Sequence, residues 1–138
     1  MGSAVAEAAG PFQFFSVTPC RIVDTRRPDG VTGGPSLGNQ VVRNFPIAGQ
    51  CGVPATAKAA VLNVTIANPS NAGYLILYPF NTTQPVVSTI NWAAGEPALA
   101  NGAIVPLSSD PTLQLAVYSE LYGGGNVHLI LDVTGYFQ

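Results

Sequence analysis

The sequence predicts an all-β protein, an antiparallel and jelly-roll-like β-sandwich of about nine strands. Short apolar segments recur along the chain, and turn residues such as Gly, Pro, Asn and Asp separate them at short intervals. No amphipathic stretch of about ten residues is available for a helix. Because parallel strands need a crossover that is usually such a helix, we expect the strands to pair antiparallel.

The clearest strand is the segment 126–137, NVHLILDVTGYF. Its side chains alternate between two faces, with Val127 and Val133 on one face and Asp132 on the other. Apolar residues also fill all three positions 129–131, so the second face is expected to be partly covered. The segment 60–66, AVLNVTI, repeats the pattern, which suggests equivalent central strands in two related halves.

The remaining strands follow from alternation and turn residues. Pro46 places its strand at an edge or near a strand end. The segment 26–39 is rich in Gly and Pro and is expected to be a long surface loop. With the strand just described, the expected strands are 14–17, 20–25, 41–47, 58–67, 74–79, 85–92, 103–108, 113–121 and 126–137.

Three connections carry specific expectations. The strand 74–79 follows 58–67 at hairpin spacing, so the two are expected to pair. The segment 93–102 is the only stretch that offers a helical turn, although Pro97 and Gly102 limit it. The run Gly123 to Gly125 lacks the Lys and the following helix of a phosphate-binding loop, and it is expected to be a hairpin turn.

The length of 138 residues suits one domain around one core. Residues 12–138 are expected to form this β-sandwich domain. Met1-Gly2-Ser3 resembles an expression remnant, and residues 1–11 are expected to be a flexible lead-in.

The surface is expected to be poor in charge, because charged residues make up 9% of the chain and hydrophobic residues 47%. A monomer with this composition would leave apolar surface uncovered, so we expect a homo-oligomer. Five basic residues and a net charge of -2 argue against a nucleic-acid partner. No apolar run approaches the ~18 residues of a membrane span, so no membrane insertion is expected.

Catalytic and metal chemistry find little support in the sequence, so we expect no enzyme, cofactor or metal. The single histidine, His128, would have to serve any Ser-His-Asp triad, but it lies within an apolar strand. Two cysteines and one histidine have no zinc spacing. A calcium site built from Asp24 or Asp29 with loop carbonyls is the alternative.

Two carboxylates, Asp24 and Asp132, follow apolar residues in predicted strands, where an unpaired charge is costly. We expect them to form structural ion pairs with Arg21 and Arg26, or to accept bonds from backbone amides.

Aromatic residues offer one candidate binding site. Trp92 ends a predicted strand and ranks first, with Tyr78 and Tyr122 as its companions. Such side chains stack on sugar rings or anchor protein interfaces, so a surface polysaccharide is a candidate partner. The alternative is that these aromatics belong to the core or its rim.

Cys20 and Cys51 are the only cysteines. A disulfide between them is favoured because the charge-poor, Gly- and Pro-rich composition suits an extracellular protein. Two buried free thiols are the alternative.

Six motifs occur in order along residues 14–137, and their combination resembles a family of secreted bacterial β modules that occur as repeats or appendages on surface and exported proteins. The resemblance implies a secreted or cell-surface, non-catalytic module and agrees with pairing of Cys20 with Cys51. It supplies no catalytic or ligand-binding residues. The motifs are TPCRIVDTR (18–26), CGVPATAKAAVLNVT (51–65), GYLILYP (73–79), STINW (88–92), ANGAIVPL (100–107) and VHLILDVTGYF (127–137).

The leading functional expectation is a structural or adhesive extracellular module that associates with copies of itself. The alternative is a carbohydrate-binding module that uses surface aromatics.

Overall fold

The computed structural model describes residues 10–138, and within this range it contains nine β-strands and no helix. The lead-in predicted for residues 1–11 therefore falls mostly outside the described residues. The strands are β1 (Phe14–Asp24), β2 (Leu37–Gly38), β3 (Val41–Phe45), β4 (Ala59–Ala67), β5 (Gly73–Pro79), β6 (Ile90–Trp92), β7 (Ala98–Pro106), β8 (Leu115–Leu121) and β9 (Asn126–Phe137).

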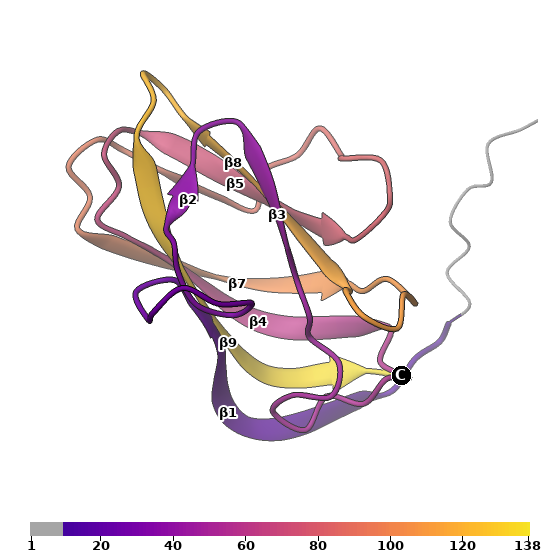
Figure 1. Cartoon of the computed structure of the whole chain (residues 1–138). Helices are drawn as coiled ribbons and strands as arrows, with labels where there is room; N and C mark the ends of the chain where they lie inside the picture. The colour runs from indigo at the N-terminus through magenta and orange to yellow at the C-terminus, as the bar shows by residue number, and fades with distance from the viewer. Residues whose placement is uncertain (1–9) are drawn as a thin grey trace, which may run out of the picture.

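The strands form two antiparallel sheets packed face to face (Figure 1). The first sheet has the order β1-β9-β4-β7, and β2 pairs with the first two residues of β9. The second sheet has the order β3-β8-β5-β6. This arrangement confirms the predicted antiparallel β-sandwich.

The core lies between the sheets and follows the alternation seen in the sequence. The odd-numbered residues of β9 from Val127 to Val133 are fully buried, whereas His128 and Asp132 are only partly so. Ile130, on the outward side, is also buried, as the apolar run 129–131 predicted. The largest fully buried side chains are Phe45, Leu37, Ile47, Leu62, Ile66, Leu75, Leu115, Leu121, Leu129 and Leu131.

The two similar segments form neighbouring strands. β4 pairs with β9 in the middle of the first sheet, and Asn63 lies opposite Asp132. Both strands have one buried face and a semi-polar outer face, which suits adjacent central positions.

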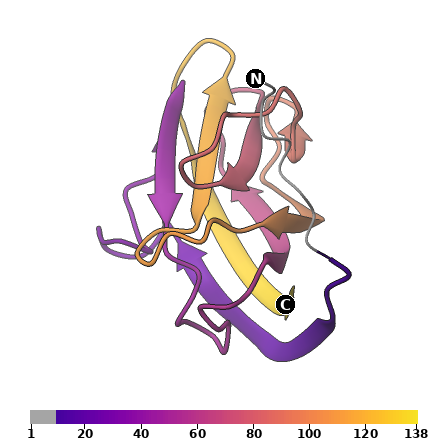
Figure 2. The same ribbon diagram turned by 90° about the vertical axis from the view of Figure 1, so that its right-hand side faces the viewer.

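The first two predicted strands are one strand, β1, which pairs with β9 along its length. A register shift between Ser16 and Cys20 accommodates Pro19, which has no amide hydrogen to donate. At the ends of this pair, Gln13 and Gln138 exchange two backbone hydrogen bonds of 2.9 and 3.0 Å. The start of β1 therefore lies beside the C-terminus (Figure 2).

Two expected hairpins were wrong because both connections pass from one sheet to the other. β5 pairs with β6 and β8 rather than with β4. The run Gly123 to Gly125 joins β8 of the second sheet to β9 of the first, and all three glycines have positive φ angles between 90° and 97°. A side chain at Gly125 would also collide with Ser70, so this crossing requires glycine there.

The segment 93–102 forms no helical turn. Its second half belongs to β7, which pairs with β4 from Ala98 to Pro106 without a register shift. Pairing along the whole of β4 thus overrides the low strand propensity of Ala98, Ala100 and Gly102.

The long loop 26–39 is largely irregular, as predicted, apart from the short strand β2. Arg43 of the edge strand β3 holds it by donating hydrogen bonds of 2.6 to 3.2 Å to four loop carbonyls. The acceptors are the carbonyls of Gly30, Gly33, Gly34 and Pro35. The predicted edge position of the strand before Pro46 is confirmed.

Candidate functional site

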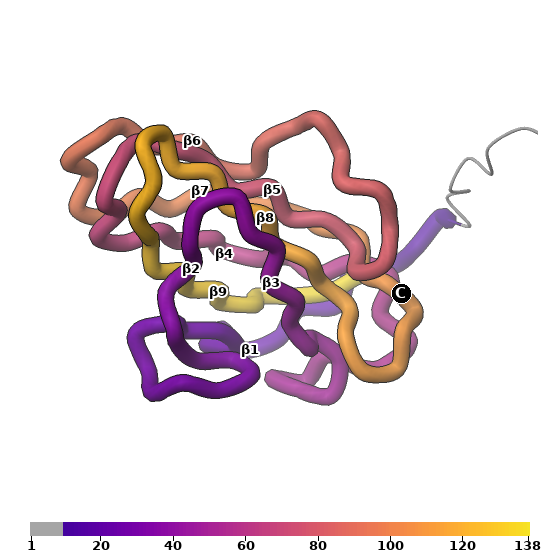
Figure 3. The backbone as a smooth tube through the Cα atoms, turned by 45° about the horizontal axis from the view of Figure 1, so that its top comes forward, coloured from indigo at the N-terminus to yellow at the C-terminus, as the bar shows by residue number. Residues whose placement is uncertain are grey.

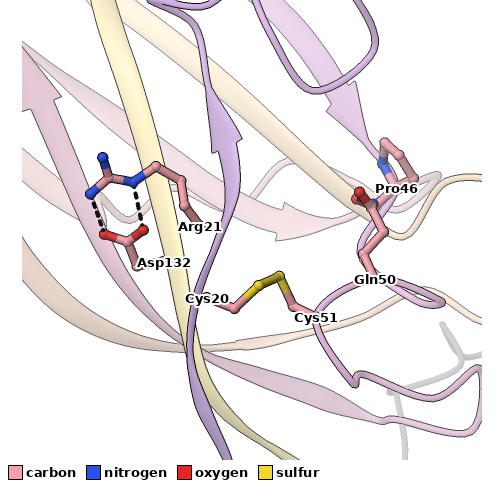
Figure 4. The surroundings of a disulfide bond; sticks show 6 residues. All are labelled: Cys20, Arg21, Pro46, Gln50, Cys51 and Asp132. Carbon is pink, nitrogen blue, oxygen red and sulfur yellow. Dashed lines mark hydrogen bonds and ion pairs between the residues drawn. A yellow bond between two sulfur atoms is a disulfide. The ribbon is translucent and has the colours of Figure 1, made fainter.

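The ion pairs expected around Asp132 are present on the outer side of the first sheet. Arg21 lies opposite Asp132 across the β1–β9 pair and donates two hydrogen bonds to its carboxylate, from Nε to Oδ1 at 2.8 Å and from Nη2 to Oδ2 at 3.1 Å (Figure 4). This bidentate hydrogen bonding to Asp132 raises the pKa of Arg21. The guanidinium also reaches Asp24, with Nη1 at 3.8 Å from Oδ2.

Asp24 is the more deeply buried carboxylate. Arg26 donates to it from Nε and Nη2, both at 2.9 Å, and from its backbone amide at 3.0 Å. These hydrogen bonds lower the pKa of Asp24 to about 2 against the opposing effect of burial. Asp24, Arg26, Arg21 and Asp132 therefore form one connected network that ties β1 to β9.

The disulfide between Cys20 and Cys51 is present, with a Cα–Cα distance of 5.7 Å. It joins β1 to the turn that follows β3 (Figure 4). Gln50 closes the same turn by donating a 2.7 Å hydrogen bond to the carbonyl of Pro46. A disulfide is compatible with an extracellular location.

Trp92 and Tyr78 do not form the predicted surface site. Trp92 is 5% exposed and donates its indole N–H to the carbonyl of Asn71 at 2.8 Å. Tyr78 is 7% exposed, and burial raises its pKa. Both therefore belong to the packing of the second sheet, the alternative recognised from the sequence.

Tyr122, the third predicted residue, is 60% exposed and lines a groove of about 250 Å³ on the outer face of the second sheet. Its ring centroid lies 6.1 Å from that of Tyr74, which in turn lies 6.3 Å from Tyr118. Ser88 and Asn91 bring hydroxyl and amide groups to the same groove. We call this surface the tyrosine groove.

One acidic residue lies beside the tyrosine groove. The hydroxyl of Tyr118 donates a 2.5 Å hydrogen bond to Glu120, which raises the pKa of Tyr118 to about 12. Tyr118 is thus a neutral donor held by its partner at physiological pH. The arrangement is suited to binding rather than to proton transfer.

The first sheet carries two shallow, adjoining grooves on its outer face. A polar groove of about 650 Å³ includes Arg21, Arg27 and Asp132. A less polar groove of about 550 Å³ lies over β4 and β7, lined by Val61 and Ile104 among others. Asn63 and Thr134 line both grooves.

The single histidine, His128, lies within hydrogen-bonding distance of a buried threonine. Nδ1 of His128 lies 3.0 Å from Oγ1 of the buried Thr25, which also accepts a 2.8 Å hydrogen bond from the amide of Leu129. Within residues 10–138, no group of three or more His, Cys, Asp or Glu side chains is placed to hold a metal ion.

Searches with this chain against protein-family models, curated proteins and solved structures find no match. In the described part of the chain, no helix has the length and apolar character to cross a membrane.

Two surface features, the tyrosine groove and the exposed face of β7, were not predicted from the sequence. Tyr74, Val87, Ser88 and Asn91 come together in the tyrosine groove only because the loop after β5 folds back over the outer face of its own sheet. The exposed residues of β7 on the outer face of the first sheet were missed because the segment 93–102 was expected to offer a helical turn rather than a strand. The weak alternation of Leu99, Ala103 and Val105 was the one available signal.

Proposed function

We propose that this protein is a non-catalytic extracellular structural or adhesive module that associates with copies of itself. The observation that carries the proposal is the uncharged surface of the first sheet over β4 and β7. Every outward residue of β7 is exposed, and Ile104 is 62% exposed. These outward residues are Ala98, Ala100, Gly102, Ile104 and Pro106.

The absence of charge on this surface and the disulfide both support this role. An uncovered sheet region without charges favours contact between subunits, because soluble proteins usually place charged side chains on such regions. The disulfide stabilises the chain in oxidising surroundings, as expected for a secreted or cell-surface module.

Sedimentation velocity across a concentration series tests the proposal. We expect the weight-average mass to exceed that of one chain at concentrations of about 10 to 100 μM, the range of a modest protein interface. A mass equal to 14.2 kDa throughout would contradict it.

Carbohydrate binding is a second candidate function, and the tyrosine groove is the observation that favours it. Tyr74 and Tyr122 present aromatic rings, while Ser88 and Asn91 offer hydrogen-bonding groups beside them. Aromatic faces with neutral polar neighbours suit the two sides of a sugar ring.

A glycan array with the variant Tyr122→Ala tests this second function. Binding that is lost in Tyr122→Ala but kept in Val31→Ala, an exposed residue of the 26–36 loop, would support it. Absence of binding to any neutral glycan would contradict it. Because Trp92 is buried, its fluorescence is expected to stay unchanged when sugar is added.

A further inference from the structure

The free edge of β7 can be mapped residue by residue. Alternate residues of a strand direct their backbone groups to opposite neighbours. At the two ends of the β4–β7 pair, the amide of Leu107 donates to the carbonyl of Lys58, and the carbonyl of Pro97 accepts from the amide of Asn68. Since no register shift intervenes, the odd-numbered residues of β7 bond to β4.

The even-numbered residues of β7 therefore turn their backbone groups away from the sheet. Ala98, Ala100, Gly102 and Ile104 each present an N–H and a C=O along the free edge, and all four are exposed. β7 lies next to β4 (Figure 3), and within residues 10–138 no further strand pairs with its other edge. The nine residues of β7 include no charged side chain.

The other three sheet edges are protected. β1 is interrupted by Pro19 and a register shift, and it is tied down by the disulfide. β3 has five residues and carries Arg43, and β6 has only three residues. These are devices that proteins use to prevent edge-to-edge pairing. Among the edges of the described residues, β7 is the long one without a charge or a register shift, and its one proline, Pro106, stands at its last position.

We infer that the β7 edge binds the β7 edge of a second copy of this chain, which joins their first sheets into one continuous antiparallel sheet. This inference rests on the proposed self-association and gives it a location. The occupant is a second copy because the edge is self-complementary. Each copy offers the same donors and acceptors, and neither brings a charge that would repel the other.

A two-fold axis at Asn101 uses the whole edge. It places Ala98 opposite Ile104 of the second copy and Ala100 opposite Gly102 of the second copy. In this register the four residues of each chain whose backbone groups point to the free edge exchange backbone hydrogen bonds with the second copy. Ile104 then packs across the strand on a small Ala side chain, which removes part of its exposed surface from water.

The variants Ala100→Pro and Ile104→Lys test the edge. Ala100→Pro removes a backbone N–H that points to the free edge. It leaves the hydrogen bonds from β7 to β4 intact, since the N–H of residue 100 does not donate to β4. Ile104→Lys places a charge on the edge. Val31→Lys is the matched control, because Val31 is 66% exposed and lies in the loop before β2. Melting temperatures verify that each variant is folded.

We expect self-association to weaken by about tenfold or more in both edge variants and to stay unchanged in Val31→Lys. If the wild-type chain associates but both folded edge variants associate equally well, the edge assignment is wrong and the proposed function stands. Equal weakening in Val31→Lys would also overturn the assignment. A wild-type chain that is monomeric throughout would overturn both.

Hydrogen exchange measured by NMR gives a second readout of the same edge. At low concentration the amides of Leu99, Asn101, Ala103 and Val105 should be protected, and those of Ala98, Ala100, Gly102 and Ile104 should exchange freely. At high concentration the second set should become protected as well. Association without new protection at these four amides would contradict the inference.

Discussion

Asp24 makes the free energy of unfolding depend on pH in the acid range. Its pKa is about 2 in the folded chain, mainly because Arg26 donates hydrogen bonds to it, and 3.8 is its ordinary value. Since the folded pKa is the lower one, the stabilisation is complete above pH 3.8 and is lost as the pH falls towards 2. The Asp24 side chain is 8% exposed, but that of Arg26 is 46% exposed, so solvent screens part of the effect.

We expect urea denaturation to show a loss of about 1–2 kcal/mol through Asp24 between pH 5 and pH 2. In Asp24→Asn this step should disappear. A smaller slope should remain from Asp110, whose pKa is lowered by hydrogen bonds from the amides of Leu113 and Thr112. An unchanged pH dependence in Asp24→Asn would show that the carboxylate is not held by Arg26.

Gly135 is a position where one added methyl group should destabilise the chain. A Cβ atom there would lie against the ring of Phe14 and 2.8 Å from the carbonyl oxygen of Phe15. The backbone of β1 would have to move away from β9, so we expect Gly135→Ala to lower the free energy of unfolding by about 1–3 kcal/mol. Thermal denaturation measures the change.

Gly102→Ala is the matched control for Gly135→Ala. Gly102 also lies within a strand, but a Cβ atom there would meet nothing within 4 Å. Its replacement should leave stability unchanged or raise it slightly, because alanine restricts the unfolded chain. Equal destabilisation by both changes would mean that the close contact with Phe14 and Phe15 is not the cause.

The positions of charged side chains were more predictable than those of aromatic side chains. A carboxylate inside an apolar strand needs a partner, so the sequence sufficed to pair Asp24 and Asp132 with the arginines. Trp92 has no such requirement. An aromatic ring with one N–H suits a buried site with one carbonyl acceptor as well as a surface, and only the packing around Asn71 decides between them.

The disulfide stabilises the arrangement of the strands, because it fixes β1 to the turn after β3. It closes a loop with a sequence separation of 31, so its reduction should cost roughly 3–4 kcal/mol by the loop-entropy relation. We expect the melting temperature to fall on addition of a reductant. The double variant Cys20→Ser/Cys51→Ser should melt at the lower temperature with or without reductant. An equal melting temperature before and after reduction would contradict the prediction.

Strands with a strong alternation were predicted well, and strands defined by their neighbours were not. β9 and β4 are clear in the sequence because each buries one full face in the core. β7 has a weak pattern, and it becomes a strand because β4 offers a complete ladder of hydrogen bonds. Local sequence carries no record of that partner.

The order of the strands in the two sheets was the least predictable feature of the fold. The turns 68–72 and 122–125 resemble hairpin turns in composition, yet each carries the chain between sheets. Turn residues specify that the chain reverses. Which sheet receives the next strand depends on how the two apolar faces meet, and that requires all strands together.

The whole-molecule charge distribution leads to a last prediction, on how association responds to salt. Two chains with a net charge of -2 each repel only weakly, and the β7 edge has no charged side chain. The dimerisation constant should therefore change little between about 50 and 500 mM NaCl, although charged contacts are screened over that range. Ammonium sulfate should strengthen association, because it favours burial of apolar surface.

Glu120→Gln serves as the control for this salt series, because it removes a charge beside the tyrosine groove and leaves β7 untouched. It should associate as the wild-type chain does at every salt concentration. Association that weakens steadily with NaCl, or that shifts in Glu120→Gln, would place the contact on a charged surface instead. The salt series thus separates a contact made by backbone and apolar groups from one made by ion pairs.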